Sequence, residues 1–95
     1  MTKEKILLQS LASDLKRITL SIQRDSSASA ERFSNEAKRW LGEAAQQVDD
    51  QAIKSLLQRI DRVLQGENDL KKAEDCLMYS MILQNRSLRA LRPSD

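Results

Sequence analysis

Residues 49–66, DDQAIKSLLQRIDRVLQG, carry the clearest structural pattern in the chain. Large apolar residues recur there at intervals of three and four, which is the spacing of one buried stripe on an α-helix. Asp49 and Asp50 stand at the start, where carboxylates cap free backbone N–H groups and complement the helix dipole. Gly66 follows the last apolar residue, where a left-handed C-cap is expected. The stretch predicts a helix over residues 50–65, with a stripe of Ile53, Leu56, Leu57, Ile60, Val63 and Leu64.

Three further segments show the same spacing, and short polar runs separate them. The serine-rich run 25–29 suits a turn, because short hydroxyl and carboxylate side chains compete with helical hydrogen bonds. Pro93 stands where a final helix commonly stops. The pattern predicts helices over residues 3–24, 28–48, 50–65 and 68–91.

Short connections place successive helices antiparallel. The predicted fold is therefore all-α: a small antiparallel four-helix bundle of up-down-up-down topology, forming one domain over residues 1–95. A three-helix arrangement is the alternative, in which 28–48 and 50–65 are continuous, because the Asp49-Asp50 link is very short.

The composition agrees with this fold class and narrows the function. Of 95 residues, 40% are hydrophobic and only 3% aromatic, and good helix formers dominate. The net charge of +2 lacks the strong basic excess of a dedicated nucleic-acid binder.

Cys76 is the single cysteine, so no internal disulfide can form, which favours a reducing compartment. The N-terminal apolar run is too short for a signal peptide, and no stretch is long enough to span a membrane. We expect a cytoplasmic protein without membrane contact.

The chain lacks the residues on which most enzyme chemistry depends. It contains no histidine, so the commonest general base and transition-metal ligand is absent. One cysteine cannot build a four-ligand zinc site. The glycine-rich phosphate loops and the G-x-S-x-G nucleophile motif are missing as well. We expect a protein that is not an enzyme and needs no cofactor or metal.

Apolar residues exceed what one stripe per helix requires. The predicted core stripe of the fourth helix is Leu70, Ala73, Leu77, Met81, Leu88 and Leu91. Cys76, Tyr79 and Leu83 lie roughly opposite this stripe, and on the first helix Ile6 and Leu20 point away from its main stripe. Either the fourth helix is the central helix of the bundle, or these five residues form a contact patch for another chain. We expect a non-catalytic protein-interaction module, such as a small regulator, chaperone or assembly subunit, that binds a protein partner or a second copy as a homodimer.

The end of the fourth helix gives a second functional hypothesis. Arg86, Arg89 and Arg92 could contact phosphates, as in a nucleic-acid-binding accessory protein. Cations near a helix C-terminus also complement the helix dipole. A spacing of three makes the arginines spiral around the helix instead of lining one strip, which argues against nucleic acid.

Overall fold

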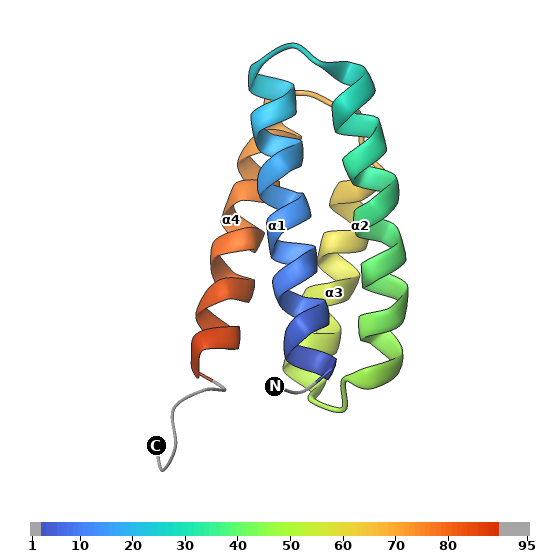
Figure 1. The fold of residues 1–95 in the computed structure, drawn as a ribbon, viewed down its shortest axis with the longest axis vertical. Helices are drawn as coiled ribbons and strands as arrows, with labels where there is room; N and C mark the ends of the chain where they lie inside the picture. The colour runs from blue at the N-terminus through green and yellow to red at the C-terminus, as the bar shows by residue number, and fades with distance from the viewer. Residues whose placement is uncertain (1–2, 90–95) are drawn as a thin grey trace.

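The computed structural model of the chain describes residues 3–89, with side-chain surroundings through residue 86. All regular structure in this part is helical: α1 (Lys3–Gln23), α2 (Ser27–Gln47), α3 (Gln51–Leu64) and α4 (Leu70–Arg89). Figure 1 shows the chain passing up α1, down α2, up α3 and down α4. Because α2 and α3 are separate, the three-helix alternative is wrong. Residues 90 and 91, the predicted end of the fourth helix, lie outside the described residues.

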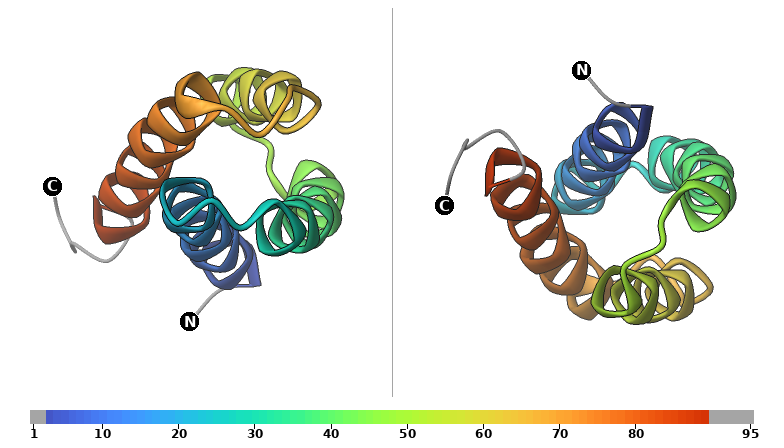
Figure 2. Two further views of the ribbon diagram at one scale, coloured as in Figure 1. Left: turned by 90° about the horizontal axis from the view of Figure 1, so that it is seen from above. Right: turned by 90° about the horizontal axis from the view of Figure 1, so that it is seen from below.

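The first helix makes the most extensive contacts with other helices. α1 packs extensively against both α2 and α4, whereas α3 makes smaller contacts with α2 and α4. Within the described part, no Cα atom of α3 comes within 8 Å of a Cα atom of α1. The end-on views of Figure 2 show α1 beside α2 and α4, with α3 on the far side of the ring. The central helix is therefore α1 and not the fourth helix.

The core draws on all four helices. Leu11, Leu15 and Ile18 of α1 are completely buried, as is Ile60 of α3. Other buried apolar residues include Ala30, Ala37, Leu41, Ala44, Val48, Leu56, Leu57 and Leu64. Phe33 and Trp40 pack against this cluster from the rim, and Arg32 and Arg39 stack on their rings at 4.9 Å and 5.1 Å. Within residues 3–89, no helix combines the length and apolar character needed to cross a bilayer.

Aspartates begin two of the helices, and Asp50 does so where the sequence predicts. Asp50 is the N-cap of α3, and its Oδ1 accepts hydrogen bonds from the backbone N–H groups of Ala52 at 2.8 Å and Ile53 at 3.3 Å. Asp69 precedes α4 and accepts from the N–H of Lys72 at 2.9 Å. These bonds satisfy donors that the first helical turn leaves free, so each helix start is fixed by local sequence.

The end of α3 differs from the expectation. Gly66 is not left-handed, and no glycine in the described chain has a positive φ. Instead, the Lys72 ammonium reaches back from α4 and donates to the carbonyl oxygens of Leu64 and Gly66, each at 3.3 Å, and to Asn68 Oδ1 at 3.0 Å. A lysine cation at a helix C-terminus satisfies carbonyls and complements the dipole. This contact replaces the glycine cap and joins α3 to α4.

Candidate protein-interaction surfaces

Close contact with α1 determines which side of α4 is buried. The Thr19 hydroxyl of α1 donates to the backbone carbonyl of Ala73 at 2.7 Å. Along α4, Ala73, Cys76, Ser80 and Leu83 follow at intervals of three and four, and all four are buried. Small side chains at the first three positions allow two helix backbones to approach closely. This row is therefore the core-facing side of α4.

The five residues of the predicted contact patch do not form one surface. Cys76 and Leu83 are completely buried, and Tyr79 is half-buried against the core. Ile6 and Leu20 are exposed on α1. A second chain could therefore reach the two α1 residues, while the α4 residues belong to the interior. The structure therefore favours the interpretation in which Cys76, Tyr79 and Leu83 belong to the core over the one in which they form a contact patch.

The accessible apolar surface of α4 lies on the other side, and three of its four residues, Leu70, Leu77 and Met81, belong to the stripe that the periodicity assigns to the core. Leu70, Leu77, Met78 and Met81 expose 72%, 38%, 46% and 55% of their area. Leu77, Met78 and Met81 line a shallow hollow of about 390 Å³ together with Glu74, Ile82 and Asn85, and Leu70 lies outside it, nearer the start of α4. We call these four exposed residues the α4 apolar face. Leu77, Met78 and Met81 form the contiguous part of this face around the hollow, and such an apolar surface marks an interaction site more often than scattered apolar residues do.

Hydrophobic spacing alone could not have located this face, because both sides of α4 are apolar. One signal in the sequence distinguishes them. Ala73, Cys76 and Ser80 form a row of small residues at helical spacing, and such a row is suited to close packing against another helix. Using the size of the residues as well as their polarity would have placed Leu77 and Met81 outside.

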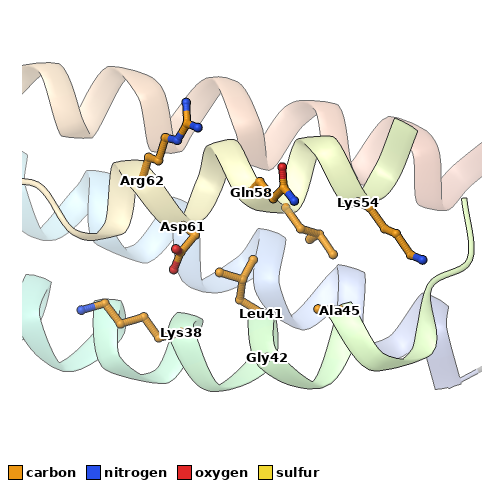
Figure 3. Close-up of a pocket in the computed structure, with 9 residues that line it drawn as sticks. Lys38, Leu41, Gly42, Ala45, Lys54, Gln58, Asp61 and Arg62 are labelled. Carbon is orange, nitrogen blue, oxygen red and sulfur yellow. The ribbon is translucent and has the colours of Figure 1, made fainter. Parts of the chain in front are cut away.

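A second surface is the groove between α2 and α3, which has a volume of about 680 Å³. Figure 3 shows its lining, with Lys38 and Asp61 at one end and Lys54 at the other, while the Arg62 side chain points away from Lys38. Leu41, Gly42 and Ala45 line it from α2, and Leu57 and Gln58 line it from α3. The groove thus has a largely apolar middle, in which Leu41 and Leu57 are mostly buried, between ends that carry lysines. We call it the α2–α3 groove.

The arginines of the nucleic-acid hypothesis are only partly described. Arg86 is half-buried. The side chain of Arg89 and all of Arg92 lie outside the described residues. Lys72, a further basic residue of α4, lies at the opposite end of the helix, where it is buried and caps α3. No described contact therefore favours phosphate binding at the end of α4.

The reactivity of the buried cysteine, Cys76, depends on the pKa of its thiol. Burial raises the pKa of the Cys76 thiol to about 11, and the positive charge of Lys72 only partly offsets this effect. A reactive cysteine needs an accessible thiolate, so Cys76 is a packing residue. Among residues 3–89, no three histidine, cysteine or acidic side chains are grouped so as to hold a metal ion.

Comparison with protein-family models, with curated proteins and with solved structures gave no match to this chain. Because no relative indicates a function, the proposals below are based on the α4 apolar face and the α2–α3 groove.

Proposed function

We propose that this protein is a non-catalytic interaction module of the cytoplasm that forms a homodimer through the α4 apolar face. The observation that carries the proposal is the exposure of Leu77, Met78 and Met81 side by side on one helix. Burying such side chains stabilises a complex by roughly 25 cal/mol per Å² of apolar area removed from water. Methionine suits these surfaces because its flexible, polarizable side chain adapts to a partner.

A second copy is the occupant that fits this surface best. Glu74 and Asn85 flank the hollow, and Lys71 beside it is paired with Asp75 at 3.8 Å on the same helix. Glu74 is the single charged residue among those lining the hollow, so the surface carries little charge that would repel an identical copy or demand a partner of opposite charge. A two-fold dimer presents the same patch from both subunits and needs only a self-complementary apolar surface.

The test is the mass of the full chain in solution, measured by size exclusion with light scattering over a hundredfold concentration range. We expect a dimer, and we expect Leu77→Lys combined with Met81→Glu to give a monomer with an unchanged helical circular-dichroism spectrum. Both positions are exposed, so the substitutions leave the core intact. Leu83, by contrast, is completely buried, and a charge there would disrupt folding before it tested any interface.

Ile6→Lys combined with Leu20→Glu is the matched control, since both residues are exposed and belong to α1. These changes should leave the dimer intact. A wild-type chain that is monomeric at every concentration would refute self-association. A dimer that only the α1 control dissociates would place the interface on α1 instead.

A further inference from the structure

The α2–α3 groove is a separate surface, and its charge indicates what it binds. Lys38, Lys54 and Arg62 line it together with a single carboxylate, that of Asp61. The Asp61 Oδ2 accepts a hydrogen bond from Gln65 at 2.8 Å, and no described carboxylate forms an ion pair with any of the three cations. The groove thus has an excess of positive charge that lacks a partner within residues 3–89.

A smaller pocket adjoins the groove at its Lys38 end. It has a volume of about 230 Å³, and Lys38 and the buried Lys72 line it together with the carboxylates of Glu31 and Glu67. Burial lowers the pKa of Lys72, and the charge of Lys38 lowers it further. The positive charges of Lys38 and Lys72 thus act on each other at this end, and the carboxylates of Glu31 and Glu67 offset part of their potential.

The shape of the groove favours a helix over a small molecule. Lys38, Gly42, Ala45, Gln58 and Arg62 are all exposed, so the groove is open along its length. Small-molecule sites usually enclose 70–90% of their ligand. On α2, a Cβ atom added to Gly42 would meet nothing within 4 Å. The α2 side of the groove is therefore low at its centre, where a guest helix could approach the backbone at Gly42 and the side chain of Ala45.

The spacing of the charges matches the turns of a helix. Lys54 and Arg62 are eight residues apart on α3, which corresponds to about 12 Å along the helix axis. Two carboxylates seven residues apart on a guest helix are separated by about 10.5 Å. We propose that the α2–α3 groove binds an acidic amphipathic helix of a partner protein. The apolar stripe of that helix packs on the exposed Gly42 and Ala45, beside the largely buried Leu41 and Leu57, and its carboxylates contact Lys54 at one end and Lys38 at the other.

The probe is a synthetic 18-residue amphipathic peptide with a leucine stripe and glutamates seven positions apart beside it. A matched peptide carries lysine in place of each glutamate. Binding to the full chain is measured by fluorescence anisotropy, and ¹⁵N amide shifts locate the site. We expect the acidic peptide to bind at least ~10-fold more tightly than the basic one, since like charges placed opposite each other oppose binding. The amide shifts should concentrate in residues 38–45 and 54–62.

Two variants test the contacts. Lys38→Glu combined with Lys54→Glu should reverse the preference and favour the basic peptide, while Lys16→Glu combined with Lys71→Glu, exposed on α1 and α4, should not. Gly42→Trp should fill the groove and weaken the acidic peptide ~10-fold or more, because a side chain there enters open space. Gly42→Ala is its matched control and should retain binding.

Equal binding of both peptides, or an unchanged affinity for Gly42→Trp, would overturn the proposal. Amide shifts centred on the α4 apolar face would also overturn it. Decanoate serves as a small anionic amphiphile in a parallel titration. If decanoate shifts the groove amides while neither peptide binds, the groove is a small-molecule site and the proposal fails. None of these results depends on whether the protein dimerises.

Discussion

The Asp14 carboxylate lies next to Glu36 of α2 and is only 1% exposed. Its Oδ1 accepts a hydrogen bond from the guanidinium of Arg17 at 3.2 Å, while Oδ2 is buried without a partner. Burial and the negative charge of Glu36 raise the pKa of Asp14 above its usual value of 3.8, and Arg17 only partly opposes this. Since the Arg17 side chain is largely in solvent, its charge is well screened. The ionised form of Asp14 therefore destabilises the fold.

We predict that Asp14→Asn stabilises the protein at pH 7 by about 1 kcal/mol, because it removes a buried charge that is incompletely paired. A raised pKa means that the folded protein binds more protons than the unfolded chain at pH values between 3.8 and the folded-state pKa. The stability that Asp14 contributes to wild type thus falls as pH rises through this window. The advantage of Asp14→Asn should accordingly be small near pH 3.5 and full at pH 7. Urea unfolding of both proteins at the two pH values measures it.

Glu43→Gln removes a carboxylate at an exposed position of α2 and serves as the control. It should change stability little at either pH, because an exposed charge is well solvated. If the difference between Asp14→Asn and wild type is the same at both pH values, the raised pKa of Asp14 is refuted.

Asp25 ends α1 in the left-handed conformation, with a φ of 56°, and no other non-glycine residue in the described chain has a positive φ. The N–H of Ser26 donates to the Ser21 carbonyl at 2.9 Å, and the N–H of Asp25 donates to the Ile22 carbonyl at 3.0 Å. These are the two bonds of a Schellman motif, whose left-handed position is usually glycine.

We predict that Asp25→Gly stabilises the protein by about 1 kcal/mol, because glycine adopts this conformation without the Cβ clash. Removing a carboxylate from a helix C-terminus adds to the gain. For a chain of this size, thermal unfolding should shift upward by about 4–8 °C. Arg24→Gly, one position earlier and without a positive φ, should not raise the melting temperature. A lower melting temperature for Asp25→Gly would contradict the prediction.

At the scale of single helices, the sequence predicts helix positions well and the orientation of α4 poorly. The starts of α3 and α4 depend on Asp50 and Asp69, which act within a few residues of themselves. The buried side of α4 depends on which side chains let it approach α1, and the bond from Thr19 to Ala73 joins residues far apart in the sequence. Periodicity detects that a residue is apolar but not which neighbour it meets. The α4 apolar face and the α2–α3 groove both depend on such neighbours, so the sequence alone did not locate them.

Gly42 lies inside α2 and lowers the stability of this helix. A glycine inside a helix costs about 1 kcal/mol relative to alanine. At this position an added Cβ would meet nothing within 4 Å, so no close approach requires glycine. We predict that Gly42→Ala raises the free energy of unfolding by about 1 kcal/mol in chemical denaturation.

Gly66→Ala is the comparison, because Gly66 follows α3 and its added Cβ would lie 3.4 Å from the Val63 carbonyl oxygen. That substitution should give a clearly smaller gain. A Gly42→Ala protein no more stable than wild type would show that α2 is not helical through residue 42 in solution.

For the whole molecule, the unequal packing of the helices predicts unequal local stability. α1 packs extensively against two neighbours, and eleven of its residues are buried. α3 has only small contacts with α2 and α4, with four buried residues. Segments with few packing contacts open at lower free energy than the global unfolding reaction. The low-stability helix also forms one wall of the α2–α3 groove, so it has the freedom to adjust to a guest helix.

We predict that backbone amides of α1 exchange with deuterium only through global unfolding, whereas those of α3 exchange through a local opening of lower free energy. Native-state hydrogen exchange by NMR at increasing denaturant concentrations separates the two routes. The comparison of residues 11–22 with residues 54–64 avoids α4, so self-association through the α4 apolar face does not bias it. If both helices exchange with the same free energy and the same denaturant dependence, the bundle unfolds as one cooperative unit. In that case α3 opens no more readily than α1, and a guest helix would have to bind the groove without local opening of α3.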